Sequence, residues 1–355
     1  MQDDLFSDGV PFALTSRSSY ISAPTAFLAR LKRNFFMSHE LDAHPIIQRV
    51  KRAIALNRHP GYHFGGNFLG LAFTEVRDAH SILELSPDTH CQDVDGQTNI
   101  AAVAMLADMG LATGIRANLD GATRLATVAL SLQLTGVPRL GPLKASSVSQ
   151  GFIQDSSGKQ GLSTSTVTAG GELLCFGTGA FMVLRPPTHM TLSPIPWVEN
   201  PPPDHVELDL DSLSEDEQWI LSHARRSLSA SLEKGDDFIR HFFGFHPHPI
   251  ERGAHAVLQN GPHVGNRVGH VQGGITLGLA LTTANAALGQ DWMLSSVTAS
   301  YVSPGEGETI TARSHTIHRG KLTAVVRTEV TSSHGRQVLE VLTNHARRGA
   351  TSIHQ

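Results

Sequence analysis

The sequence has few cysteines, little net charge and no long apolar run, and each shortage excludes a class of protein. Its two cysteines, Cys91 and Cys175, give no disulfide framework and no metal spacing, which favours a reducing cytoplasm. The formal net charge of −4 gives no overall basic field, so nucleic acid is not an expected partner. No apolar stretch reaches the length of a membrane span, and the acidic start lacks the apolar core of a signal peptide. We expect a cytoplasmic protein that binds neither membrane nor nucleic acid.

The histidines are many but carry no metal-binding pattern. There are 20 of them, scattered along the chain, and none forms an HExxH-type pair. We therefore predict no metal site and no bound cofactor.

What the sequence does contain is an internal repeat. Residues 78–116 and 253–288 each hold a short apolar strand that begins at Ala-His, then a polar, glycine-containing loop, then a long apolar segment. A repeat of this size indicates two copies of one folding unit, because a solenoid needs three or more short repeats. The length of 355 residues suits two domains.

The two copies predict the same order of elements. The apolar segments at about 98–116 and 272–288 are too long for strands and apolar on all sides, which indicates two buried helices. The strands predicted before these helices are 67–77 and 81–85 in the first unit, and 238–245 and 254–259 in the second. The strands predicted after them are 123–135, 142–155, 159–169 and 172–184, and 293–302, 308–317, 322–331 and 337–345.

The remaining segments frame these units. We predict an N-terminal helical leader at 1–60, a first repeat at 61–184, a Pro-rich linker at 185–214 and a second repeat at 215–348. The helical pattern of the leader covers 24–58 with a break near Pro45. The second repeat is predicted to open with a helix over 215–231, capped by Ser214 or Ser212.

Short motifs in both units carry a resemblance to a known family. The second unit contains Asn266-x-x-Gly269-x-x-Gln272-Gly273-Gly274, and the first contains Leu106-Ala107-Asp108, nine residues after Asn99. These strings resemble the N-x-x-G-x-x-H-G-G signature and the L-x-D of the phenylacetate-type thioesterases, which belong to the hotdog-fold acyl-CoA thioesterase superfamily. The strand end at 300–304 and the hairpin at 318–321 resemble further parts of that family. The resemblance implies an α+β double hotdog, in which two repeats, each a long buried helix wrapped by an antiparallel sheet, form a pseudo-dimer.

The resemblance also implies that only one active site is intact. In the family, the helix N-terminus of one protomer faces the carboxylate on the central helix of the other. Here the first unit keeps Asp108 but has Asn99-Ile100-Ala101 in place of H-G-G, whereas the second keeps the glycines but has Leu281 at the acidic position. Paired as in the family, the units form one composite site from Gln272, Gly273 and Asp108, and one relic.

The resemblance assigns roles to the residues of the composite site. The N–H of Gly273 would bind the oxyanion, and Asp108 would act as nucleophile or general base. Asn266 and Gln272 would hold the thioester or the attacking water. Thr127 resembles the Ser or Thr that orients water beside the acid, although its alternation with apolar neighbours predicts that it faces away from the helix.

Three further residues are predicted to bind substrate. They are Gly274, Arg319 and Lys321, of which the two cations would meet the phosphates of coenzyme A. Structural roles compete with these assignments: the glycines suit helix packing, Gln272 suits a helix cap, and Arg319 and Lys321 suit a solvated hairpin.

The predicted function is hydrolysis of a small-molecule acyl thioester, carried by coenzyme A or by a carrier protein, with no cofactor beyond the coenzyme A of the substrate. A hotdog dehydratase is one alternative, but its usual pairing of histidine with an acid is missing from the sequence. A non-catalytic double hotdog that binds an acyl thioester or another ligand is the second alternative, because one site is visibly degenerate. A homo-oligomer of the chain is also expected.

Overall fold

The computed structural model describes residues 41–59, 63–119, 123–156, 158–186, 188 and 207–349. The first repeat contains β1 (Ala72–Arg77), β2 (His80–Leu85), α4 (Ile100–Arg116), β3 (Arg124–Leu134), β4 (Leu143–Gln154), β5 (Lys159–Ala169) and β6 (Glu172–Leu184). The second repeat contains β7 (His248–Ile250), β8 (Gly253–Gln259), α7 (Gly273–Leu288), β9 (Trp292–Tyr301), β10 (Thr309–Arg319), β11 (Thr323–Ser332) and β12 (Gln337–Arg347).

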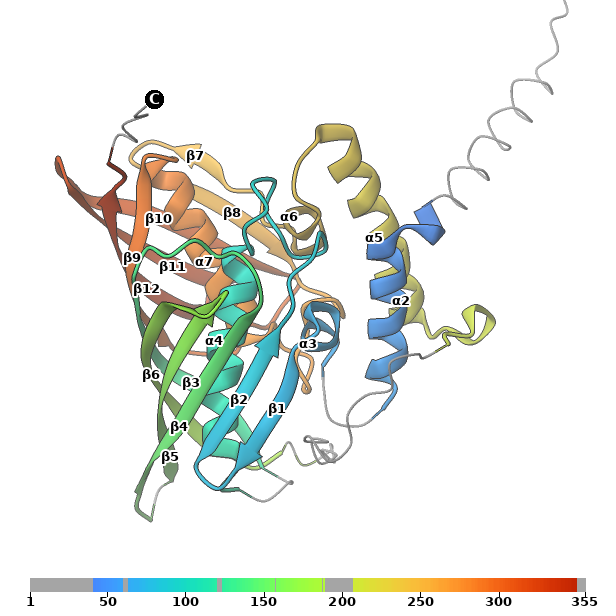
Figure 1. Cartoon of the computed structure of the whole chain (residues 1–355), viewed down its shortest axis with the longest axis horizontal. Coiled ribbons are helices and arrows are strands. Elements are labelled where there is room, and N and C mark those ends of the chain that lie inside the picture. The colour runs from blue at the N-terminus through green and yellow to red at the C-terminus, as the bar shows by residue number, and fades with distance from the viewer. Residues whose placement is uncertain are drawn as a thin grey trace, which may run out of the picture.

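All 12 described strands form one antiparallel sheet that curves around α4 and α7 (Figure 1). Its order is β1-β2-β4-β5-β6-β3-β9-β12-β11-β10-β8-β7, so the second half repeats the first in reverse. The halves meet where β3 pairs with β9, from Ala129 opposite Ser300 to Gln133 opposite Ser296. The predicted double hotdog, with its two repeats joined as a pseudo-dimer, is confirmed.

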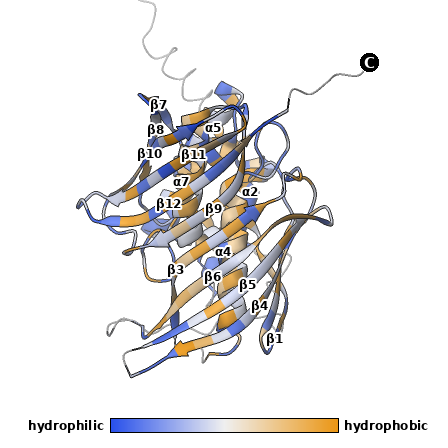
Figure 2. Cartoon of the chain, turned by 90° about the vertical axis from the view of Figure 1, so that its left-hand side faces the viewer, coloured by the Kyte–Doolittle hydropathy of each residue, from blue (hydrophilic) through white to orange (hydrophobic). Residues whose placement is uncertain are grey.

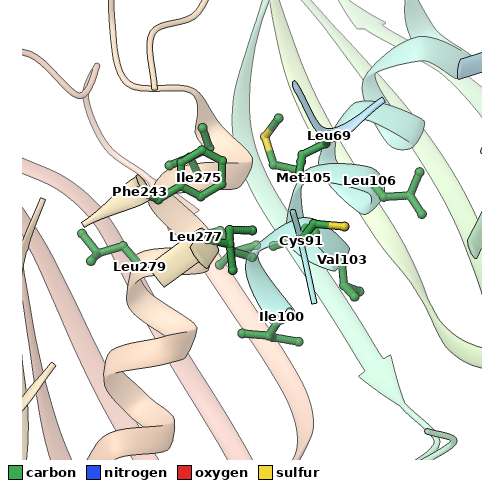
Figure 3. Close-up of a cluster of buried hydrophobic side chains, with 14 of the residues drawn as sticks. Leu69, Cys91, Ile100, Val103, Met105, Leu106, Phe243, Ile275, Leu277 and Leu279 are labelled. Atoms are coloured by element: carbon green, nitrogen blue, oxygen red, sulfur yellow. The ribbon is translucent and has the colours of Figure 1, made fainter. Parts of the chain in front are cut away.

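The two central helices pack against each other at unusually small residues. A Cβ atom built on Gly274 of α7 would lie 2.7 Å from the Cα of Met105 in α4, and one on Gly278 would lie 2.6 Å from the Cβ of Ala101. Figure 3 shows Ile275 and Leu277 of α7 in the same cluster of buried side chains as Met105 of α4. This close contact brings the N-terminus of α7 to the middle of α4.

The sequence of α4 explains why it is buried on nearly every side. Almost all its residues are apolar, and its one acidic residue, Asp108, is buried with them. The strands alternate instead between apolar and polar residues, which Figure 2 shows as changing colours along the sheet. A sheet with one apolar face and two apolar helices therefore encloses a large main core, and a smaller cluster lies around the C-terminal end of α7.

In the described part of the chain, four further helices lie outside the sheet: α2 (Pro45–Asn57), α3 (Phe64–Leu69), α5 (Glu215–Lys234) and α6 (Phe238–Phe243), together with the 3-10 turn η1 (Leu210–Ser212). α2 and α5 lie side by side (Figure 1). Two bidentate ion pairs join these segments, Arg58 with Glu217 and Arg225 with Asp42, at 2.7–2.8 Å. They tie the segment before the first repeat to the first helix of the second.

Two of the predicted strands are wrong. Residues 238–243 form α6, because Phe238, Ile239 and Phe242 follow helical spacing and Gly244 ends the helix with φ of +76°. The predicted strand 67–77 begins inside α3, which ends at Gly70 with φ of +74°, and only its second half is β1.

The opening helix of the second repeat begins as predicted and runs three residues further, to Lys234. Ser214 caps it by accepting a hydrogen bond from the N–H of Glu217, and the carboxylate of Glu217 accepts one from the N–H of Ser214. In the leader the structure describes α2, while residues 1–40 and most of the linker lie outside the described residues. The domain boundaries stay predictions. Within the described ranges, no helix combines the length and apolar character needed to cross a membrane.

Candidate active site

The predicted acid, Asp108, lies in the middle of α4 with only 4% of its surface exposed. Thr127 Oγ1 donates a hydrogen bond to its Oδ1 at 2.9 Å, and Gln272 Nε2 donates one to its Oδ2 at 3.0 Å. Burial raises the pKa of Asp108 from its ordinary 3.8 to about 6, although hydrogen bonds from Thr127, Gln272 and the backbone of Gly274 oppose this rise. The carboxylate is thus held ready to accept a proton near neutral pH.

Thr127 points toward the helix, contrary to the prediction that it faces away. The pairing of β3 with β6 shifts register between Thr127 and Ala129, which marks a bulge. Because a bulge resets the alternation of side chains, Thr127 shares the inner face with the buried Leu130. The bulge therefore delivers the hydroxyl to Asp108.

Gln272 is both a helix cap and a member of the site. Its Oε1 accepts a hydrogen bond from the N–H of Ile275 at 2.9 Å, which caps α7. With the oxygen so fixed, its NH₂ must face Asp108, as the bond at 3.0 Å requires. One side chain thus links the start of α7 in the second repeat to the acid of the first.

Gly273 is the first residue of α7 and borders the same carboxylate. A Cβ atom built on it would lie 3.3 Å from Asp108 Oδ2 and 3.3 Å from Thr127 Oγ1. Among the described residues, no group hydrogen-bonds to its N–H. A helix N-terminus offers such unpaired donors to negative charge, so this space suits an oxyanion or a water molecule.

Tyr301 is a site residue that the sequence did not single out by itself. Its hydroxyl donates to the carbonyl of Gly273 at 3.1 Å, and burial together with the charge of Asp108 raises the pKa of Tyr301. The hydroxyl therefore stays protonated and holds the first peptide of α7. The aromatic residue of the 300–304 strand end was the signal that pointed to it.

These groups line a cavity of about 520 Å³. Apolar side chains from α4, β3 and β6 form part of its wall, among them Met109, Leu125 and Phe181. The cavity also contains residues that sequence reasoning missed: His63, Arg116, Arg124 and Arg267. Only the fold brings these four together, because they come from separate segments and follow no motif.

Asn266 and Gly274 have structural roles in this arrangement. Asn266 lines the cavity, but its Oδ1 accepts hydrogen bonds from the N–H groups of Val268 and His270 and so shapes the loop before Gln272. Its predicted contact with the thioester stays a prediction. Gly274 was predicted to bind substrate, but its position is explained by the close packing of α7 against α4 and by its hydrogen bond to Asp108.

The structure places Arg319, and the hairpin that also carries Lys321, away from Asp108, so their predicted binding of substrate stays a prediction. Arg319 donates to the carbonyl of Leu288 and stacks over Trp292, at the C-terminal end of α7. That end is about 22 Å from Gly273 along a helix of this length. Neither cation lines the cavity, because the hairpin that carries them lies at the opposite end of α7.

The reciprocal site is closed to the same chemistry. Asn99 caps α4 through the N–H of Ala101, and its Nδ2 donates to Asp93, which also pairs with Arg139 at 3.1 Å. The counterparts of Gly273 and Asp108 there are the apolar Ile100 and Leu281. Neither residue can supply a proton acceptor.

A family model described as the acyl-CoA thioesterase N-terminal domain matches residues 262–346. The match covers the loop before Gln272, α7 and the strands from β9 to β12. A comparison with curated proteins gives no match.

Solved structures match between 40% and 79% of this chain. A Lactobacillus plantarum protein described as an oleoyl thioesterase is 9% identical over 76% of this chain and 96% of its own, with a TM-score of 0.50. An Alicyclobacillus acidocaldarius protein of unknown function with a hot dog fold is 10% identical over 79% and 96%, with a TM-score of 0.48. A Bacillus halodurans protein solved with CoA is 27% identical over 40% of this chain and 99% of its own, with a TM-score of 0.37. The similarity to the Lactobacillus plantarum protein shows a shared fold and nothing further.

Proposed function

We propose that this chain is a hotdog-fold thioesterase that hydrolyses an acyl thioester at one composite site between its repeats, a proposal supported by its double-hotdog fold and by the match of its second repeat to an acyl-CoA thioesterase domain. The observation that carries the proposal is the hydrogen bond from Gln272 of the second repeat to Asp108 of the first. Thr127 completes the group from the first repeat. The substrate is a small-molecule acyl-CoA.

In the proposed reaction Asp108 acts as a general base. It takes a proton from a water molecule held beside Thr127 and Gly273, and the water oxygen attacks the thioester carbonyl carbon. The N–H of Gly273 stabilises the oxyanion that forms. When the C–S bond breaks, the proton on Asp108 passes to the leaving thiolate, so that the products are a carboxylic acid and a free thiol.

Hydrolysis is favoured over the dehydratase alternative by the partners of the acid. Asp108 accepts hydrogen bonds from a threonine, an amide and a backbone N–H, and no histidine bonds to it in the described part of the chain. Hydroxyl and amide groups orient water but do not exchange protons near neutral pH. The elevated pKa of Asp108 favours an enzyme over a binding protein, because a binding site has no need of a buried base.

Thiol release from a panel of short, long and aromatic acyl-CoAs tests this function. We expect turnover by the natural chain and a loss of about 10²–10⁴-fold in Asp108→Asn, the usual contribution of a general base. Asp93→Asn, which changes the acid that Asn99 contacts in the reciprocal site, should keep turnover. A protein that binds these thioesters without releasing thiol would instead be the non-catalytic alternative.

A labelling experiment separates the two roles predicted for Asp108, general base and nucleophile. A single turnover in heavy-oxygen water, followed by mass spectrometry of the peptide that contains Asp108, should leave that carboxylate unlabelled. Label in the side chain would mean that Asp108 attacks the carbonyl itself.

Two further parts of the proposal concern the setting of the enzyme. We place it in the cytoplasm, supported by Cys91 and Cys175, which are both free thiols. Association of the chain into a homo-oligomer, measured by light scattering, stays a prediction.

A further inference from the structure

The cavity that contains Asp108 carries basic groups that the proposed reaction does not use. Arg116, Arg124 and Arg267 all line it. Among the described lining residues, Asp108 is the only carboxylate, and its oxygens already accept hydrogen bonds from its own neighbours. The lining therefore has more positive than negative charge.

Two of these arginines lack an anionic partner. Arg116 Nη1 donates to the carbonyl of Thr123 at 2.9 Å, and burial lowers the pKa of Arg116 to about 10, with the nearby charge of Arg267 adding to the effect. The Nε of Arg124 is buried and has no hydrogen-bond partner in the described structure. Neither residue pairs with a described carboxylate. Both residues are half-buried. Because a guanidinium partly removed from water without an anion is costly, an anionic ligand would be bound favourably here.

His63 adds a neutral donor to the same cavity. Its Nδ1 accepts a hydrogen bond from the N–H of Gly66 at 3.0 Å, so the ring proton lies on Nε2. Burial lowers the pKa of His63, which keeps the ring neutral. The Nε2 atom is buried and has no partner among the described residues. It is a second unpaired donor in the wall that contains the arginines.

The wall between Asp108 and the arginines is mostly apolar. Arg116 follows Asp108 by eight residues on α4, which is about 12 Å along the helix axis. The side chains of Met109 and Ala112 lie between them on α4, and Leu125 and Phe181 contribute from the sheet. An aliphatic chain suits such a wall, whereas the pantetheine arm of coenzyme A carries amides that need hydrogen-bond partners.

We propose that the substrate's acyl chain ends in a carboxylate, which Arg116 and Arg124 bind while the thioester lies at Asp108. The preferred substrates are then half-thioesters of dicarboxylic acids rather than thioesters of plain fatty acids. Guanidinium groups bind carboxylates through charge-assisted, bidentate hydrogen bonds, which give affinity and also fix the position of the acyl chain in the cavity. This inference rests on the proposed function and specifies its substrate class.

Matched substrate pairs test the inference. The kcat/KM of adipoyl-CoA is compared with that of hexanoyl-CoA, and the kcat/KM of suberoyl-CoA with that of octanoyl-CoA. We expect a preference of about tenfold or more for the carboxylate member, the usual effect of one charge-assisted hydrogen bond, and mainly in KM. Arg116→Met and Arg124→Met should bring the ratio close to one. Arg313→Met, on the exposed face of β10, removes an equal charge and should keep the preference.

The possible outcomes separate this inference from the proposed function. Hydrolysis without preference overturns the inference alone. If the arginine variants slow all CoA thioesters equally but spare N-acetylcysteamine thioesters, the arginines bind phosphate and the inference is wrong. If no thioester is hydrolysed, the proposed function fails, and calorimetric titration with adipate against hexanoate still tests the anion site. Thermal unfolding of each variant identifies a folding defect.

Discussion

Replacing the buried acid should make the protein more stable and less active at the same time. In the folded chain Asp108 has a pKa of about 6, whereas an exposed aspartate has 3.8. The folded state therefore binds the proton more tightly than the unfolded state does. The stability that this proton gives is fully present below about pH 4 and is lost as the pH rises through about 6.

The size of the effect follows from the two pKa values. The difference between about 6 and 3.8 corresponds to about 3 kcal/mol of folding free energy. The asparagine of the Asp108→Asn variant cannot ionise, so this variant does not lose folding free energy as the pH rises. Relative to the natural chain, the variant should gain about 3 kcal/mol between pH 4 and pH 8. Its amide must still find partners at Thr127 and Gln272, which offsets part of the absolute gain but none of its pH dependence.

Urea unfolding, followed by tryptophan fluorescence at several pH values, measures this difference. The buried histidines also make stability depend on pH, but they are the same in both proteins and cancel in the comparison. A difference in stability that stays constant with pH would refute the reasoning, because it would mean that the folded pKa of Asp108 is ordinary. A variant that loses stability but keeps thiol release would show a structural carboxylate.

The other predictions concern the pH profile and the neighbours of Asp108. Values of kcat/KM for thiol release should rise through about pH 6 and level off above it, since the base must be ionised; a flat profile from pH 5 to pH 8 would count against this role. Gly273→Val should lower turnover by about 10²-fold by filling the space beside the carboxylate, whereas Ile100→Val at the reciprocal position should not. Thr127→Val should lower turnover roughly five- to tenfold and move the midpoint of the pH profile upward, because the carboxylate loses a donor; an unchanged midpoint would contradict the hydrogen bond at 2.9 Å. Leu281→Asp should create no second activity and should lower the free energy of unfolding by several kcal/mol, as an unpaired buried charge does.

Much of the fold could be predicted because its signals are local. The apolar segments of α4 and α7 and the eight strands that follow them show their periods directly in the sequence. The short helices α3 and α6 were missed because six residues give too few turns to show a helical period. Their glycine caps, Gly70 and Gly244, were the available signals.

In the candidate site, too, the residues that belong to local motifs could be predicted and the others could not. Asp108, Gln272 and Gly273 stand in motifs, so spacing alone could suggest them. The orientation of Thr127 could not be predicted, because it depends on a bulge, and a bulge is a property of how two strands pair. The arginines of the cavity were missed for a similar reason, because only the folded structure brings them to the wall of one cavity.

Duplication explains how one site could be lost while the other was kept. In a homodimer, any change at the helix N-terminus or at the acid appears in both sites, so neither site can diverge alone. In a fused pair, Ile100 and Leu281 can become ordinary core residues, each buried, without touching Gln272 or Asp108. The remaining site then needs one half of its groups from each repeat, because Asp108 and Thr127 come from the first and Gln272 from the second. The sheet joined at β3 and β9, and the helices packed at glycine, therefore set the geometry of the proposed site as well as that of the core.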